Sequence, residues 1–352
     1  MTNFRELFRE YIESVKIPSD ADSTIVEKGW NSIYKILLPN IPEKLFRYRS
    51  VNDYSIDDFK KGEISLCHAG MFPDKYDSCL FVDKKVVKQN IDNGYDSWML
   101  IFLESIRLHP ELYPSTEIVA RTHEYMKGGY TNEQIRDILK VHIGNTYIND
   151  FISYLKNKES RFRSPRNSAK IGCFTESVHS KYMWDRYGGG YKGFALRYDF
   201  RNIKEMHSKK THELELFPVF YSEERLNATY EEMVVFMLDF MKQTGFSSSA
   251  IMEYRKHYPV NQLYWFLSYL YKDKKVYEHE QEWRMLYYNL TNEDDYYSIS
   301  DKDCVKAIYY GPDISNEDRN TLREIAVKRG VEEFNVVFDE DSSKFDLKAI
   351  PI

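Results

Sequence analysis

Apolar residues in the first part of the chain recur every three or four positions, which predicts helices with one buried face. Residues 3–16 show this spacing, and it returns after Ser23 until Pro39, where a helix is expected to stop. The pattern then changes to the alternation of strands at LFRYRS (45–50) and EISLCH (63–68). Gly62 is expected to close a short helix between them. This change predicts that a sheet begins near residue 44.

Residues from about 82 to 160 return to helical spacing and carry few strand signals. Strands are expected again at AKIGCFTE (169–176), GFALRYDF (193–200), ELFPVFYS (215–222) and EWRMLYY (282–288), with helices at 229–243 and 248–271. The pattern of the last part of the chain predicts a strand at CVKAIYYG (304–311), a helix at SNEDRNTLREIAVKRG (315–330), a strand at EEFNVVF (332–338) and a final extended piece at FDLKAI (345–350). We therefore expect an α+β fold with a mixed β-sheet core, arranged as one domain over residues 1–352. Its parts are N-terminal helices at 1–40, a sheet core from 44–80 and 170–350, and a large helical insertion at about 82–160.

Composition and charge narrow the classes of protein. Hydrophobic residues make up 42% of the chain and there are 29 Tyr, which is enough material for a packed core. The formal net charge of −6 argues against a protein that coats nucleic acid nonspecifically. A basic run at 156–170, with Arg161, Arg163 and Arg166, leaves a local nucleic-acid site open, and a solvated loop is the alternative.

Cysteine usage and apolar stretches predict an intracellular protein without a metal. The four cysteines lie far apart and form no CxxC pair, so neither a disulfide framework nor a structural zinc site is expected. The N-terminus lacks the apolar region of a signal peptide, and the longest apolar stretches are too short to span a bilayer. These features predict a cytoplasmic protein that does not enter the membrane.

Two arginines occupy alternate positions of the first expected strand. Arg47 and Arg49 share one face there, and Tyr48 points to the other. Paired guanidinium groups either meet carboxylates, bind a phosphate or carboxylate ligand, or lie on a solvated edge.

Polar and aromatic side chains gather around the next strands. Thr175 follows an apolar run at a sheet rim, where sites often form. Cys173 and His179 are candidates for a nucleophile pair, although Cys173 also suits simple packing. Trp184 and Tyr187 precede three glycines and could stack on a planar ligand. The loop at 71–77 contributes two acids.

Two carboxylates lie near the start of the EWRMLYY segment. If this segment is extended, Glu280, Glu282 and Arg284 share one face. Adjacent carboxylates repel, and the pKa of one rises unless a cation sits between them. Such a pair suits acid–base catalysis or the stabilisation of a developing cation, and salt bridging through Arg284 is the structural alternative.

Taken in order, these clusters resemble a bacterial family called domain of unknown function 2971. The matching segments are FRYRS (46–50), FPDKYD (72–77), CFTE (173–176), MWDRY (183–187), KGF (192–194), EQEWR (280–284) and AIYYGPDIS (307–315), and the resemblance spans about residues 44–349. The chain departs from the family pattern at FPDKYD, where Pro73 replaces an Asn and Lys75 a Pro.

The motif order is also similar to that of the ADP-ribosyltransferase superfamily. This likeness implies that Arg47 or Arg49, with Tyr48 between them, holds the pyrophosphate of NAD and that Thr175 supports the nicotinamide ribose. It further implies that Glu282, with Glu280, engages the ribose hydroxyl, and that Trp184 or Tyr187 stacks on a ring. A fixed carboxylate would stabilise the oxocarbenium ion that forms when the nicotinamide–ribose bond breaks.

The resemblance therefore implies an NAD-consuming enzyme with an ADP-ribosyltransferase-like fold, which acts as a toxin or phage-defence effector. Such an enzyme would transfer ADP-ribose to a macromolecular acceptor or hydrolyse the dinucleotide as an NAD glycohydrolase. Two alternatives stay open. One is a defence protein that binds or cleaves nucleic acid. The other is a non-catalytic ligand-sensing module, in which the clustered Arg, Glu, Trp and Tyr residues form an internal hydrogen-bonded network.

Overall fold

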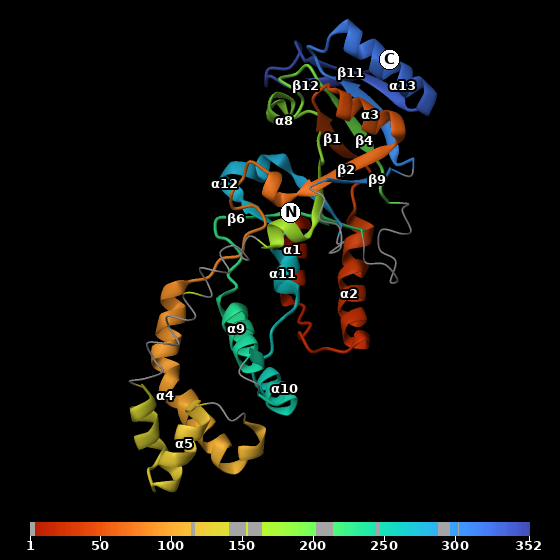
Figure 1. Cartoon of the computed structure of the whole chain (residues 1–352). Coiled ribbons are helices and arrows are strands. Elements are labelled where there is room, and N and C mark those ends of the chain that lie inside the picture. The colour runs from red at the N-terminus through yellow and green to blue at the C-terminus, as the bar shows by residue number, and fades with distance from the viewer. Residues whose placement is uncertain are drawn as a thin grey trace.

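The structure is a computed structural model that describes residues 4–113, 117–140, 153, 164–201, 214–243, 246–287, 296–301 and 303–352. It is a mixed α/β fold with an open mixed sheet, and a group of helices extends away from the sheet (Figure 1). The segment predicted as an insertion at about 82–160 is mostly helical where it is described, and its residues 114–116, 141–152 and 154–160 lie outside the described part.

The large sheet has the strand order β12-β11-β10-β4-β1-β3-β2-β9, and β8 pairs with both β3 and β5. Strand β11 runs parallel to β10, whereas the other pairs in this sheet are antiparallel. The strands are β1 (Leu45–Arg49), β2 (Glu63–His68), β3 (Lys170–Thr175), β4 (Phe194–Tyr198), β5 (Leu214–Pro218), β8 (Glu282–Tyr287), β9 (Tyr296–Ser300), β10 (Val305–Tyr310), β11 (Glu332–Phe338) and β12 (Leu347–Pro351). A second, parallel pair joins β6 (Phe220–Ser222) to β7 (Tyr271–Asp273).

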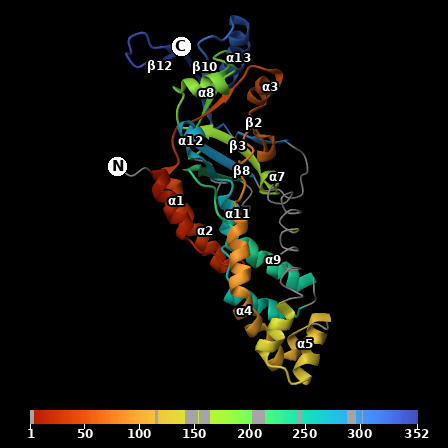
Figure 2. The ribbon, with the colours of Figure 1, turned by 90° about the vertical axis from the view of Figure 1, so that its left-hand side faces the viewer.

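Helices surround the sheet and form the extended part. The α-helices are α1 (Phe4–Ser14), α2 (Ser23–Leu37), α3 (Asp53–Lys61), α4 (Lys84–Leu108), α5 (Glu117–Lys127), α7 (Ser164–Ser168), α8 (Lys181–Arg186), α9 (Thr229–Gln243), α10 (Ser248–His257), α11 (Leu263–Leu267), α12 (Lys274–Tyr277) and α13 (Asn316–Arg329). Short 3₁₀ turns are η1 (Leu38–Asn40), η2 (Ala69–Met71), η3 (Pro110–Leu112) and η4 (Glu278–Glu280). In Figures 1 and 2, α4 and α5 point away from the sheet.

Local sequence explains where several elements end. Asn52 and Ser55 form a capping box at the start of α3, and Gly62 ends this helix in the left-handed conformation with φ 70°. The helix expected at 248–271 is instead two helices, because Pro259 follows α10 and cannot continue it. The strand expected at 215–222 is likewise divided between β5 and β6 after Pro218, which has no backbone N–H for the ladder.

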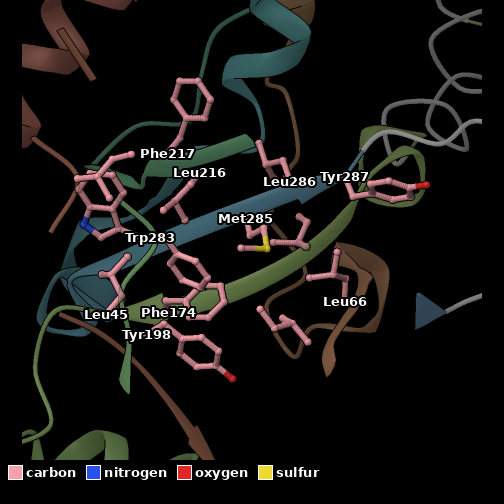
Figure 3. Packing of buried hydrophobic residues seen from close by; sticks show 14 of the residues in the cluster. Leu45, Leu66, Phe174, Tyr198, Leu216, Phe217, Trp283, Met285, Leu286 and Tyr287 are labelled. Atoms are coloured by element: carbon pink, nitrogen blue, oxygen red, sulfur yellow. The ribbon is translucent and has the colours of Figure 1, made fainter. Parts of the chain in front are cut away.

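The main core lies where α1 and α2 pack against β5 and β8. Ring centroids are 6.3 Å apart for Phe8 and Phe217 and 6.4 Å apart for Phe4 and Trp283. Figure 3 shows the apolar side chains of β3, β5 and β8 interleaving in this cluster. A second cluster around Phe46, Tyr48, Trp184 and Tyr309 packs α8 onto β1 and β10. These two clusters fix the strand ends that carry the polar site described below.

Candidate functional site

Arg284 is the centre of a buried network of charged side chains. It lies on β8, and its guanidinium donates to both carboxylate oxygens of Asp77 at 2.8 and 2.5 Å. Its Nε donates to Glu282 at 2.9 Å, and Nη1 also reaches the carbonyl of Tyr269 at 2.6 Å. The Arg284 side chain is 0% exposed, so these partners replace the water that a guanidinium normally keeps.

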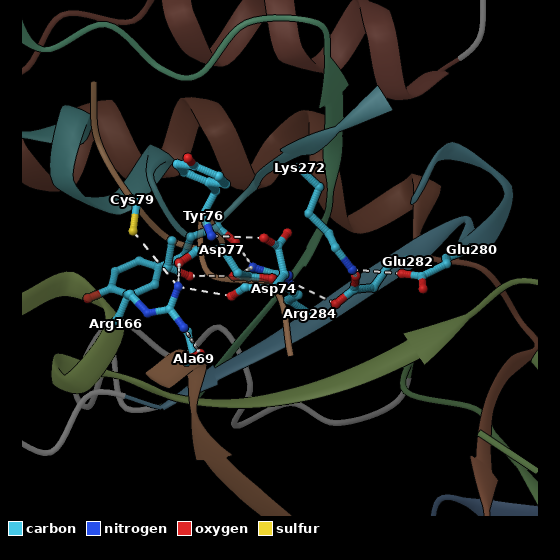
Figure 4. A network of polar contacts seen from close by, with 12 residues as sticks. Ala69, Asp74, Tyr76, Asp77, Cys79, Arg166, Lys272, Glu280, Glu282 and Arg284 are labelled. Atoms are coloured by element: carbon cyan, nitrogen blue, oxygen red, sulfur yellow. Dashed lines mark hydrogen bonds and ion pairs between the residues drawn. The ribbon is translucent and has the colours of Figure 1, made fainter. Parts of the chain in front are cut away.

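Lys272 continues the network toward η4. Its Nζ lies 2.7 Å from Glu280 and 2.7 Å from Glu282, between the two carboxylates (Figure 4). Tyr187 donates to the other oxygen of Glu280 at 2.9 Å, and the hydroxyl of Thr175 donates to the Glu280 carbonyl at 2.6 Å. Every carboxylate oxygen of the pair therefore has a donor.

The paired charges favour the ionised forms of Glu282 and Lys272. Burial alone would raise the pKa of Glu282, but Arg284 and Lys272 outweigh burial and lower this pKa below its usual range. Burial would lower the pKa of Lys272, whereas Glu282 and Glu280 raise it above its ordinary value. The cation that the sequence required between the two carboxylates is thus Lys272.

Arg166 attaches a loop to this network from the side of α7. Its guanidinium donates to the backbone carbonyls of Ala69 at 2.8 Å, Asp74 at 3.0 Å and Asp77 at 3.1 Å (Figure 4). The residue is buried, so it does not present its charge to a phosphate backbone. Its predicted companions Arg161 and Arg163 lie outside the described residues.

Cys173 lies beside the network and not beside His179. Burial first, and then the carboxylate of Glu282, raise the pKa of the Cys173 thiol well above its ordinary value. The Nδ1 of His179 is 2.9 Å from the carbonyl of Leu347, at another part of the fold. A thiol with a raised pKa and without the predicted histidine beside it is a poor nucleophile.

Four of the predicted site residues meet in this network: Thr175, Tyr187, Glu280 and Glu282. Glu280, however, is not on the strand. It ends the η4 turn, and Gln281 after it adopts the left-handed conformation with φ 46° and ψ 48°, so β8 begins only at Glu282. Because of this turn, Glu280 reaches Lys272 from outside the strand and is not in line with Glu282 and Arg284 on β8.

The predicted arginine pair lies on the other face of the sheet. Phe46 pairs with Thr175, which pairs with Glu282, so these three side chains share one face and Arg47 points to the opposite one. Accordingly, the Arg47 guanidinium lies over the ring of Phe174 at 5.8 Å.

The arginine pair has its own partners. Arg47 donates to the Ser65 carbonyl at 2.7 Å, and Arg49 forms an ion pair with Asp58. Burial, and then the neighbouring Arg47, lower the pKa of Arg49 to about 10. The arginine pair and Glu282 share no contact among the described residues.

Tyr48 and Trp184 are part of the hydrophobic core. Their rings pack edge to face with centroids 4.9 Å apart, and Trp184 is 0% exposed. The indole N–H donates to the Val178 carbonyl at 2.8 Å, and the Tyr48 hydroxyl donates to Ser177 at 3.0 Å. Both polar groups are satisfied inside the fold.

A surface groove with a volume of about 610 Å³ lies beside the network. Its lining comes from α1, β6 and the α12–η4 segment: Arg5, Glu6, Arg9, Phe220, Tyr221, Glu223, Lys274, Lys275, Glu278, His279 and Gln281. The Tyr221 hydroxyl accepts from the backbone N–H of Glu282 at 2.7 Å, and Arg5 donates to the Glu282 carbonyl at 2.6 Å. The groove and the network therefore share a wall. Within the described residues, no group of three side chains is arranged to hold a metal.

Sequence patterns missed Lys272, Tyr221 and Arg5. Lys272 stands on a three-residue strand, directly after the segment expected to be helical, and Arg5 stands on an amphipathic helix where a charged residue signals only a solvated face. The sequence did contain one signal for Lys272: the carboxylates of Glu280 and Glu282 lie close together, and such a pair needs a cation nearby to stay ionised.

The fold and the site define a mixed α/β protein built around a buried ion network. Residues 183–285 match the model of a family described as Protein of unknown function (DUF2971). The matched segment includes α8, β4 and the EQEWR motif. No curated protein and no solved structure matches the chain, and the comparisons lend no support to a likeness with ADP-ribosyltransferases. The described helices include none long and apolar enough to cross a membrane.

Four of the motifs that carry this resemblance meet in space. Asp77 of FPDKYD, Thr175 of CFTE and Tyr187 of MWDRY all bond to residues of EQEWR. Glu176 of CFTE accepts from the Trp283 indole at 2.7 Å and pairs with Arg5 at 2.6 Å. These four segments are thus parts of one polar cluster.

Proposed function

We propose that the chain is a non-catalytic ligand-binding module, and that the groove beside the network holds a small ligand with an anionic group. The observation that supports this proposal most is the state of Glu282. One of its carboxylate oxygens is bound by Arg284 and the other by Lys272, and all three side chains are at most 7% exposed. The carboxylate faces its own partners and not a substrate.

A catalytic carboxylate needs a different setting. To stabilise an oxocarbenium ion, its negative charge must point at the reacting carbon and be stronger there than in the ground state. In this network, Lys272 and Arg284 already neutralise the charge of Glu282. The arginine pair expected to hold a pyrophosphate is on the other sheet face. NAD consumption stays a prediction, and release of nicotinamide from NAD is the measurement that tests it.

The charges of the groove favour an anionic ligand. Its lining carries four arginine or lysine side chains against three glutamates. Lys274 lies 3.7 Å from Glu278, and Arg9 interacts with Glu13 on the same helix without a close ion pair, whereas Lys275 has no ion-pair partner among the described residues. Such cations gain charge-assisted hydrogen bonds when a phosphate or carboxylate binds.

Gln281 adds a second argument for the groove. It is exposed at the groove wall, and its left-handed backbone costs on the order of 1 kcal/mol for a residue with a Cβ. Glycine would avoid this cost. The presence of glutamine at this position would be explained if its side-chain amide contacts a ligand in the groove.

The test is binding of inorganic pyrophosphate, ADP-ribose and NAD to the full chain, measured by calorimetry and by the rise in melting temperature. We expect at least one of these anions to bind, because each offers phosphate oxygens to Arg9 and Lys275. The double variant Arg9→Ala, Lys275→Ala should lose about tenfold or more in affinity, since hydrogen bonds to charged groups contribute roughly 1.5–3 kcal/mol each.

The matched control is Arg121→Ala, Lys127→Ala on α5, which removes two surface cations away from the groove and should leave affinity unchanged. Equal affinity of the groove variant and wild type would contradict the assignment of the groove. Release of nicotinamide from NAD by the wild-type protein would contradict the non-catalytic role.

A further inference from the structure

The helical insertion is attached to the sheet by two stems that meet at the ion network. The outgoing stem runs from β2 through η2 to α4, and the returning stem is α7, which leads into β3. Arg166 on the returning stem donates to three backbone carbonyls of the outgoing stem, at 2.8, 3.0 and 3.1 Å. One guanidinium therefore holds both stems together.

The outgoing stem is itself bonded to the sheet through Asp77. This residue is 1% exposed and receives both Nη atoms of Arg284. The ring of Phe72, on the same stem, lies 5.8 Å from the Arg284 guanidinium. A shift of the stems would therefore displace Arg284 or break a buried ion pair, which is strongly unfavourable because it leaves a charge without a partner away from water.

From Arg284 the bonds continue to the groove without a gap. Arg284 binds Glu282 at 2.9 Å, and Glu282 binds Lys272 at 2.7 Å. The Glu282 backbone bonds to Tyr221 and Arg5, which line the groove. The path from Arg166 to the groove wall thus consists of hydrogen-bonded, buried groups with defined partners.

We propose that the insertion controls the groove through this path, so that a partner that moves the insertion alters the groove wall. The proposal rests on the proposed function for its consequence, which is regulated ligand binding. The coupling itself concerns only this chain, and it is measured without any ligand. The Arg166 bonds are the point where the two stems can be separated.

The test is hydrogen exchange of the full chain carrying Arg166→Ala. We expect amides of residues 69–79 to exchange faster, and with them amides of 219–222 and 280–283, by about tenfold. The matched control is Arg329→Ala, because Arg329 also donates to a backbone carbonyl, that of Phe59 at 2.7 Å, and pairs with Asp301. Its loss should loosen α3 and α13 and leave the groove amides at the wild-type rate.

Arg166→Lys is the second variant, to be used if the alanine variant does not fold. Lysine keeps the charge but cannot bond to all three carbonyls in the same way, so the same amides should exchange faster by a smaller factor. Faster exchange confined to 69–79 and 164–168 would overturn the coupling. With inorganic pyrophosphate as the probe, Arg166→Ala should also change affinity by about threefold or more. If the groove binds no anion, the exchange pattern still decides the coupling. If it binds and the pattern is absent, only the regulation fails.

Discussion

Glu282 joins two cations in a place that water does not reach, so the loss of its charge leaves both without a full set of partners. We expect Glu282→Gln to lower the free energy of unfolding by about 3–5 kcal/mol, as measured by urea denaturation, because breaking a buried pair strands the remaining charge. Glu278→Gln, four residues earlier, is the control. Glu278 is exposed and 3.7 Å from Lys274, and such surface pairs contribute about 1 kcal/mol or less. Equal losses in the two variants would show that the network does not carry stability.

The chemistry of single residues was the most predictable feature of this site. Two nearby carboxylates demanded a cation, and the sequence identified Thr175, Tyr187, Glu280 and Glu282 as members of a site. It did not identify Lys272, because a lysine on a three-residue strand that follows a helix-like run carries no periodic signal. Arg166 was expected to be a surface cation, since a basic run does not show which member turns inward.

At the scale of elements, the junction between η4 and β8 is formed by Gln281, which has a strained left-handed backbone and lines the groove proposed to bind a ligand. We expect Gln281→Gly to raise the free energy of unfolding by roughly 0.5–1 kcal/mol, because glycine takes the left-handed conformation without a Cβ penalty. The same variant should bind pyrophosphate more weakly than wild type if the amide contacts the ligand. Gly330→Ala at the end of α13, where φ is 64°, is the converse control and should destabilise. A stabilised variant with unchanged affinity would remove Gln281 from the binding site.

Elements with strong local signals were predicted well, and those set by partners were not. Strands at 45–49 and 305–310, the helix at 316–329 and the ending of α3 at Gly62 follow from alternation, period and capping. The η4 turn does not, because its left-handed Gln281 has no residue-type signal. Nor could the division of 248–271 be read from apolar spacing alone, although Pro259 marked it.

At the scale of the whole molecule, strand order decides which predicted residues meet. The sequence indicated a sheet that the chain leaves and re-enters. In the structure β2 and β3 are neighbours in the sheet, and the described residues between them include α4 and α5. Register was not predictable. One pairing, Phe46 with Thr175, places Arg47 and Glu282 on opposite faces. A shift of one residue would have reversed that result, because side chains alternate with a period of two.

The packing of α2 onto β5 makes the stability of the whole fold depend on pH. Glu215 on β5 is 3% exposed and accepts a 2.5 Å hydrogen bond from Tyr34 on α2. Burial raises the pKa of Glu215 to about 7 from an ordinary value of 4.5. The folded state then binds a proton more tightly than the unfolded state, so this residue favours folding below pH 4.5, and its contribution is lost as pH rises to about 7.

Glu215→Gln keeps an acceptor for Tyr34 and cannot ionise. We therefore expect the variant to match wild type near pH 4.5 and to exceed it in free energy of unfolding by about 3 kcal/mol at pH 8. Urea denaturation of both proteins across this range measures the difference, with Glu278→Gln as the exposed control that should run parallel to wild type. The comparison isolates Glu215. The pKa of Glu282 is lowered, so its contribution to stability is lost as pH falls below the ordinary pKa of a glutamate, and this effect is the same in both proteins. Parallel curves for wild type and Glu215→Gln would mean that the carboxylate keeps an ordinary pKa and that α2 does not seal it from water.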